Sequence, residues 1–298
     1  MVHKWNNQLI AFQQIKMSNE LRQHIRLFKN NAQPDIILDG CILPSPKQRY
    51  DRKKHLCKLI DCIAQTSIGR YVLQEMSSNI RIMSLDIDSE RDILGVYIEE
   101  DKIINILPKV FCYPVYVQIN VLVHEAMHAI HKQMEKDIQE QLLLKNHEKL
   151  NVYDQFVLKF LSETACCING QLGGLCAVPQ QDKKVVNIRP LFFNKDYWQM
   201  YYDEALGVVQ REKNPKSCLQ AKHTSTYYKI IQSYFKLHPE LRDARLMKRI
   251  HRGWNIFATA LKNELEKCGP QKISSQSVFD GFEGQIPHLV DRAINIKF

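Results

Sequence analysis

Two histidines and a glutamate stand at a spacing that suits metal-assisted hydrolysis, because His124, Glu125 and His128 form the pattern HExxH. Four residues advance an α-helix by about 400°, so the two imidazoles fall on one face, one turn apart. Neutral imidazole is a good ligand of Zn²⁺, and zinc lowers the pKa of a bound water. Glu125 is then placed to take the proton of that water as it attacks a carbonyl carbon, and to return it to the departing amine.

A catalytic zinc ion takes a third protein ligand and keeps a fourth position for water. Glu163 is the preferred third ligand, because it lies in an apolar stretch where a carboxylate is costly to bury unless it is paired or metal-bound. Its small neighbours Thr164 and Ala165 would let two helices approach. Asp154 and Glu148 remain rival ligands.

His131 is the other histidine of the same segment. It is nearly in line with His124 on a helix but lies a further turn away, which favours a solvent-facing or supporting position over ligation. The alternative for the whole motif is an accidental match on an ordinary amphipathic helix. The uncharged residues Val123, Ala126 and Met127 around the motif favour a buried helix that carries polar groups for a reason.

The elements that must position these residues follow from hydrophobic periodicity. The pattern after Pro114 is helical through Lys132, and alternation upstream predicts a hairpin of strands at Gly95–Ile98 and Ile103–Leu107. The sequence therefore predicts an α+β fold with a small antiparallel sheet beside the motif helix and mostly helices elsewhere. Further helices are expected at residues 8 to 29 and 51 to 76 and over most of the chain after 132, with a short strand at 36 to 38 and breaks at 170 to 179, 187 to 196 and 268 to 284.

This arrangement resembles the gluzincin type of zincin metallopeptidases, in which an edge strand precedes HExxH and a glutamate follows on a second helix, here within Ser162–Ala165. The order of segments over roughly residues 59 to 170 further resembles bacterial metallopeptidases that include effector-like proteins. The resemblance implies a zincin-like fold, one Zn²⁺ per chain held by His124, His128 and Glu163, and Glu125 as base. The second helix is less acidic than is usual in that group, which leaves the third ligand open.

No Ser/Gly/Pro-rich linker separates two composition regimes along the chain, which favours one domain. We expect a single zincin-like domain over residues 1–298, with a helical extension at 1–50, a metallopeptidase core at 51–180 and a helical region at 181–298.

Zincins commonly add a Tyr or His that hydrogen-bonds the developing oxyanion, and His223 is the preferred candidate. Core or surface packing is expected for the other residues considered, Tyr153, Tyr201, Tyr202, Tyr227 and Tyr228, and buried packing for Cys166 and Cys167.

Composition bounds the partners and the compartment. The net charge is +9, but the basic clusters lie among apolar residues at helical spacing, so no nucleic-acid partner is expected. Nine cysteines without a CxxC pair indicate a reducing compartment. The N-terminus lacks the pattern of a signal peptide and no apolar run reaches the length of a membrane span, which predicts cytoplasmic-type folding and signal-independent delivery if the protein enters a host cell. The oligomeric state is left open.

Three functions are compatible with these residues. The first is a zinc-dependent peptidase that cleaves a protein or peptide substrate, with a bacterial effector protease as one form of it. Such a substrate would bind as an extended chain by main-chain pairing with the strand pair expected at Val96 to Leu107. The second is a zinc hydrolase of a non-peptide amide or ester, and the third is a non-catalytic zinc-binding interaction protein.

Overall fold

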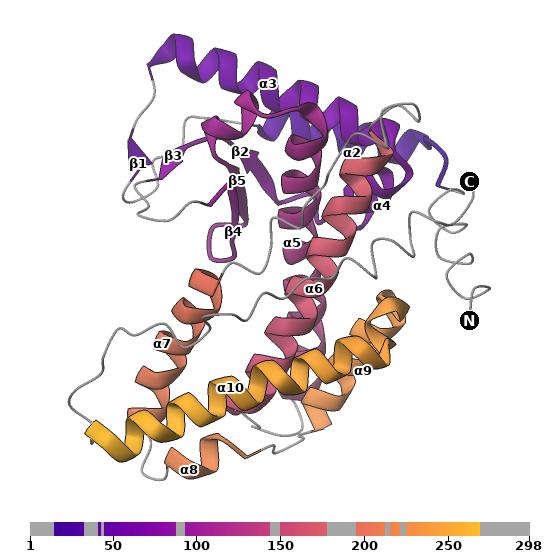
Figure 1. Ribbon diagram of the computed structural model, residues 1–298. Helices are drawn as coiled ribbons and strands as arrows, with labels where there is room; N and C mark the ends of the chain where they lie inside the picture. The colour runs from indigo at the N-terminus through magenta and orange to yellow at the C-terminus, as the bar shows by residue number, and fades with distance from the viewer. Residues whose placement is uncertain are drawn as a thin grey trace. The chain divides into compact units, whose positions relative to one another are not determined.

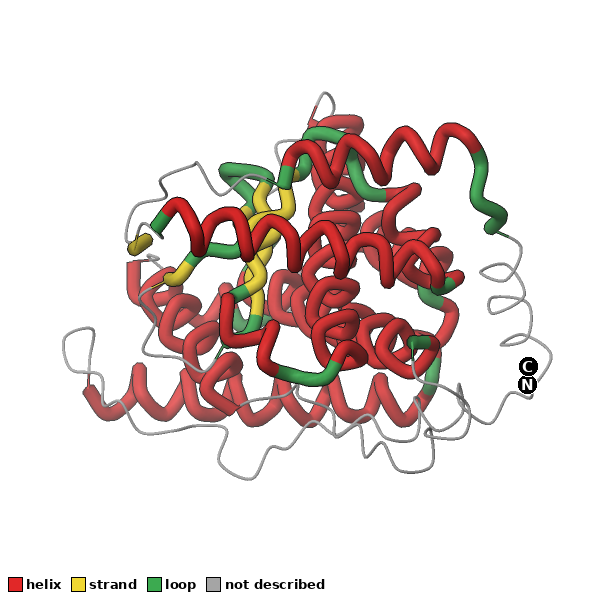
Figure 2. The backbone as a smooth tube through the Cα atoms, turned by 90° about the horizontal axis from the view of Figure 1, so that it is seen from above, coloured by secondary structure: helices red, strands yellow, loops and turns green. Residues whose placement is uncertain are grey.

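The computed structural model describes residues 15–32, 41–42, 45–87, 93–143, 150–177, 195–211, 215–220 and 225–268. Within them the chain is mostly helical and carries a small three-stranded mixed sheet, which agrees with the predicted α+β class. Figure 2 shows the strands as a small group among the helices. The strand predicted at residues 36 to 38, and the first part of the helix predicted from residue 8, lie outside the described residues. No helix of the described chain has an apolar stretch long enough to span a membrane.

Internal contacts divide the chain into two compact units. Unit 1 comprises Met1–Gln133, Cys166–Ile188 and His288–Phe298, and unit 2 comprises Met134–Ala165 and Arg189–Pro287. Two long helices, α5 (Val115–Leu143) and α6 (Val152–Cys176), run from one unit into the other. The predicted single domain with its three segments is not tested by this division and stays a prediction.

The helices α2 (Asn19–Asn31), α3 (Pro46–Gln65) and α4 (Ser67–Glu75) belong to unit 1. Ser45 and Gln48 close a reciprocal capping box that starts α3, which satisfies backbone N–H groups left open at a helix N-terminus. The helix predicted over 51 to 76 is interrupted at Thr66. This residue adopts an extended conformation and its hydroxyl accepts a hydrogen bond from the Gly69 amide, so it ends α3 and caps α4.

The sheet of unit 1 has the order β2 (Arg81–Met83), β5 (Ile103–Ile106), β4 (Gly95–Ile98), with the three strands side by side in Figure 1. The predicted hairpin is confirmed, since β4 and β5 pair antiparallel across a short turn. The prediction of a wholly antiparallel sheet is wrong, because β2 pairs parallel with β5. The tight turn between β4 and β5 requires these two strands to be antiparallel. β2 pairs with the other edge of β5, and the connection from β2 to β4 is long enough to allow β2 either direction relative to β5.

A buried side-chain amide binds the backbone just after the C-terminal end of β2. Asn105 of β5 is fully buried, accepts a hydrogen bond from the Leu85 amide at 2.7 Å and donates one to the Leu85 carbonyl at 3.1 Å. Beyond this point β3 (Asp86–Ile87) pairs antiparallel with β1 (Cys41–Ile42). The amide contact satisfies backbone groups where the β2–β5 ladder ends.

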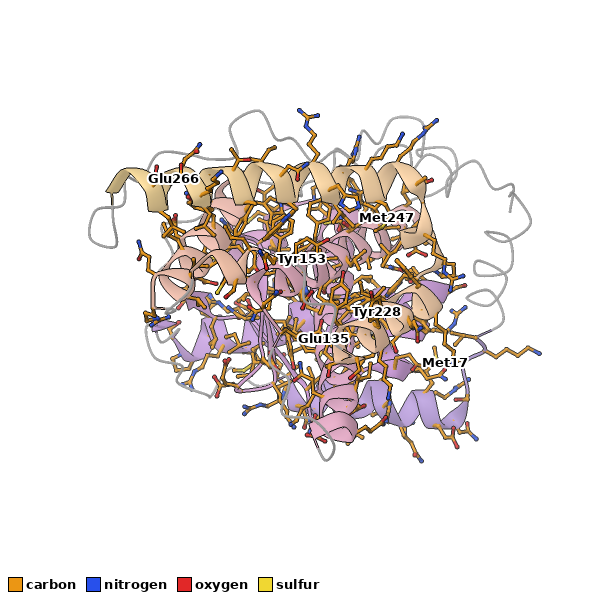
Figure 3. The ribbon with its side chains drawn as sticks, turned by 90° about the horizontal axis from the view of Figure 1, so that it is seen from below. Met17, Glu135, Tyr153, Tyr228, Met247 and Glu266 are labelled. Carbon is orange, nitrogen blue, oxygen red and sulfur yellow. The ribbon has the colours of Figure 1, made fainter. Side chains whose placement is uncertain are left out.

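Unit 2 is helical in its described residues and is built on an aromatic core. Phe156 of α6 packs on Trp198 of α7 (Lys195–Arg211) and on Phe257 of α10 (Ala244–Cys268), with ring centroids 5.6 and 5.2 Å apart. Tyr153, labelled in Figure 3, meets Trp254 of α10 edge to face at 4.7 Å. The remaining elements are α8 (Pro215–Cys218), α9 (Ser225–Leu237) and a 3₁₀ turn, η2 (Pro239–Arg242).

The two long helices are longer than their sequence patterns predicted. The motif helix α5 continues beyond Lys132 to Leu143, and α6 continues to Cys176. The break predicted from Gly170 is therefore wrong for its first residues. The glycines of that stretch lie inside the helix. Because they have no side chain, the neighbouring helix α5 can approach closely.

Candidate metal centre

Three side chains of the two long helices offer a donor set for a metal ion. His124 and His128 of α5 and Glu163 of α6 each supply one ligand atom, and these atoms lie within 4.8 Å of one another. The Nε2 atoms of the two histidines are 3.1 Å apart. Two nitrogens bound to one tetrahedral zinc at about 2.0–2.1 Å would be about 3.3 Å apart, so the spacing fits this ion.

The register of α5 against α6 explains why Glu163 reaches the histidines. Along α6, Cys166 meets His131 of α5, and Gly170 meets His124, so the helices are antiparallel. Glu163 precedes Gly170 by seven residues, about two helical turns, and therefore lies on the same face of α6. Gly170 also meets Asn120, so seven residues along the antiparallel pair bring Glu163 to the level of residues 127 to 131, the turn that carries His128.

Gly170 permits the close approach of these helices. A Cβ atom at this position would lie 2.5 Å from Asn120 Oδ1, 2.8 Å from the Asn120 carbonyl oxygen and 3.2 Å from His124 Cβ. Two of these distances are shorter than carbon–oxygen contacts allow, and one of them is to backbone, which cannot rotate away. A Cβ atom at Gly174 would likewise lie 2.6 Å from the carbonyl oxygen of Tyr116.

The Gly170→Ala variant is therefore expected to lose about 1–3 kcal/mol of unfolding free energy and to bind zinc more weakly, because the added methyl group pushes α6 away from His124. Urea unfolding and a zinc titration measure the two effects. Gly207→Ala is the matched control: Gly207 lies in α7 with nothing within 4 Å of its missing Cβ. That exchange is expected to raise stability by up to about 1 kcal/mol. Unchanged zinc affinity in folded Gly170→Ala would contradict the role of the close approach.

The carboxylate of Glu125 lies beneath the edge strand. Glu125 is 8% exposed, and a Cβ at Gly95 of β4 would lie 2.9 Å from Glu125 Cγ and 3.3 Å from Oε1. Only glycine leaves room for this carboxylate against the sheet. The sequence prediction that the hairpin lies beside the motif helix is thus confirmed by a direct contact.

The edge strand presents backbone groups beyond the sheet. Leu107 donates to the Leu94 carbonyl at 3.0 Å, and the hydrogen-bonded pairs alternate along β4 and β5 from that point. The N–H and C=O groups of Gly95 and Tyr97 therefore point away from β5, toward the side of β4 that no described strand occupies. An extended chain could pair with them.

Two positions were predicted for His131, solvent-facing or supporting, and the structure excludes the first. It is fully buried, with Nδ1 3.6 Å from the Sγ of Cys166, so the solvent-facing alternative is wrong. Cys166 and Cys167 are buried, as predicted, and Cys166 has the histidine neighbour that the sequence did not indicate. The contact of His131 with Cys166, one turn beyond the proposed ligands, agrees with the antiparallel register of α5 and α6 that Gly170 indicates.

Asp154 and the tyrosines considered as oxyanion donors lie within the described residues. Asp154 is buried near the start of α6 and does not join the three-residue donor set. Glu148 and His223 lie outside the described residues. Tyr201 and Tyr202 are buried in the aromatic core as predicted, and burial raises the pKa of both phenols, so they stay protonated at physiological pH. Of the remaining tyrosines, Tyr227 is buried, Tyr153 packs on Trp254, and Tyr228 is 51% exposed.

Gly95 and Gly170 were not identified from the sequence as parts of the site. Both carry a readable signal. A glycine within an alternating strand pattern marks a close backbone approach, and glycines spaced three and four residues apart, as at 170, 173 and 174, mark one face of a helix.

No protein-family model matches this chain, and no curated protein or solved structure matches it. The functional inference therefore rests on the side chains and their geometry.

Proposed function

We propose that this chain is a zinc-dependent peptidase with a zincin-like arrangement of edge strand, motif helix and ligand helix. The observation that supports it is the convergence of His124, His128 and Glu163, which come from two helices and lie within 4.8 Å of one another. Two imidazoles and one carboxylate are the ligand set of catalytic zinc sites that keep a fourth position open.

Zinc at this centre would lower the pKa of a water molecule and polarise a carbonyl oxygen. The chain's own groups do the rest. Glu125 follows His124 directly on the helix, so its Oε atoms can take a proton from the attacking water and pass it to the leaving amine. The nearby strand β4, packed on this carboxylate through Gly95, keeps bulk water from one side of it.

The open edge of β4 favours a peptide over other substrates. Backbone groups of Gly95 and Tyr97 face outward there, two residues apart on the same edge, and can exchange hydrogen bonds with one extended chain. The contact of Gly95 with Glu125 means that such a chain would pass next to the base. A non-peptide amide or ester would leave this edge unused.

The test of this function is cleavage of a proteome-derived peptide library by the purified protein. We expect about one zinc per chain by elemental analysis and new peptide termini that disappear after chelation and return with zinc. One zinc per chain with ester hydrolysis but no new termini would favour the non-peptide hydrolase. A protein that binds no zinc would return the motif to an accidental match.

A further inference from the structure

Tyr97 lies at the centre of β4, between two contacts that tie this strand to α5. Side chains alternate along a strand, so Gly95 and Tyr97 of β4 project to one side, and Glu99 follows in the turn after the strand. Gly95 meets Val121 and Glu125, and Glu99 meets Lys132 with 3.9 Å between the carboxylate and the ammonium nitrogen. The side of β4 that carries Tyr97 is therefore the side that faces α5.

The same two contacts fix the part of α5 that Tyr97 faces. Val121, Glu125 and Lys132 lie within about 40° of one another around the helix, and His128 falls on the same stripe between the last two. Gly95, at the start of β4, lies at Glu125, and Glu99, in the turn after β4, lies at Lys132, so β4 and α5 run in the same direction. Tyr97 thus stands over the turn that carries His128, beside the proposed base.

The hydroxyl of Tyr97 makes no hydrogen bond to another of the described residues, and the side chain is only half-buried. Burial, with further contributions from Glu99 and Glu100, raises the pKa of its phenol above the ordinary value. The group is therefore a neutral donor at physiological pH. A half-buried donor on the wall of a site is available to a bound molecule.

We propose that Tyr97 is a catalytic residue that donates a hydrogen bond to the carbonyl oxygen of the bond being cleaved. This rests on the proposed peptidase function. As the water oxygen bonds to the carbonyl carbon, the π electron pair moves onto the carbonyl oxygen, and the Tyr97 hydroxyl stabilises that negative charge while keeping its own proton. When the C–N bond breaks, the amine nitrogen takes the proton held by Glu125, so no further reactant is needed.

The two roles of Tyr97 are separable. Its backbone amide and carbonyl face the open edge of β4 and hold an extended substrate, whereas its side chain faces α5. Substitution by phenylalanine removes only the hydroxyl. Strand pairing, ring packing and zinc ligation should all remain, so the loss is confined to the charge that develops on the substrate oxygen.

The experiment compares zinc-loaded wild type with Tyr97→Phe for binding of an N-phosphoryl dipeptide, whose tetrahedral anionic phosphoryl group imitates that charge. We expect about 10- to 100-fold weaker binding, the size of one hydrogen bond to a charged group, with zinc affinity and acetohydroxamate binding unchanged. Tyr50→Phe is the matched control, since Tyr50 is 69% exposed on α3. It should bind both compounds as wild type does.

Equal phosphoryl-dipeptide affinity in wild type and Tyr97→Phe would overturn the role of Tyr97 and leave the peptidase proposal intact. Equal weakening of acetohydroxamate and zinc binding would also overturn it, because the side chain would then act on the metal centre as a whole. A wild-type protein whose affinity for the phosphoryl dipeptide does not depend on zinc would overturn the proposed function itself, and the inference with it.

Discussion

Glu125→Gln is expected to lower the rate of peptide hydrolysis by roughly 10²- to 10⁴-fold while one zinc per chain is retained. Glutamine has nearly the shape of glutamate, so the contact of this side chain with Gly95 and the burial of the motif helix should be preserved. What disappears is the oxygen that accepts and returns the proton. The measurement is kcat on a peptide from the library experiment, with zinc content determined on the same preparation.

Glu140→Gln is a suitable control for this exchange. Glu140 lies on the same helix, is exposed, and forms an ion pair with Lys136 at 3.7 Å of the kind that contributes little. Its substitution should leave both rate and zinc content unchanged. Glu125→Gln protein that retains zinc and the full rate would remove Glu125 from the mechanism and with it the HExxH interpretation.

Much of the site was predictable because its parts depend on short-range patterns. The helical spacing of His124 and His128 needs only the period of α5, and the β4–β5 hairpin needs only alternation and a turn. Glu163 is indicated by a different property, the free-energy cost of burying a carboxylate in an apolar stretch. The structure brings it to the histidines, although it is only half-buried there.

Features that depend on long-range pairing were not predictable in the same way. The parallel pairing of β2 with β5 is a choice of neighbour that strand periodicity does not encode. The glycines from Gly170 onward resemble a helix break locally, and only the partner helix, with Asn120 against Gly170, shows that they are packing positions. His131 shows the same limit, since its burial depends on Cys166 of another helix.

Position on a strand also decided which tyrosine lies near the motif. The tyrosines downstream of the motif begin with Tyr153 on α6, whereas Tyr97 precedes the motif in sequence. The hairpin returns Tyr97 to α5 through Gly95 on one side and Glu99 on the other. Proximity to Glu125 is thus a property of sheet topology.

Removal of metal ligands is expected to have the largest effect on zinc. Zinc sites with four protein ligands bind with about 10–16 kcal/mol, about 3 kcal/mol for each ligand, so one lost ligand should weaken affinity roughly a hundred-fold or more. His128→Ala and Glu163→Ala should therefore both emerge from dialysis without zinc, as measured by elemental analysis and by competition with a chelator.

His131→Ala separates ligation from helix packing. It removes an imidazole of the same helix that is fully buried against Cys166, so we expect about 1–3 kcal/mol lower stability with one zinc per chain retained. If His131→Ala lost zinc and Glu163→Ala kept it, the third zinc ligand would be His131 of α5 and not Glu163 of α6. Since His131 lies one turn beyond His128 and its Nδ1 faces α6, such a result would require the metal to lie deeper between the helices than the His124–His128 spacing indicates.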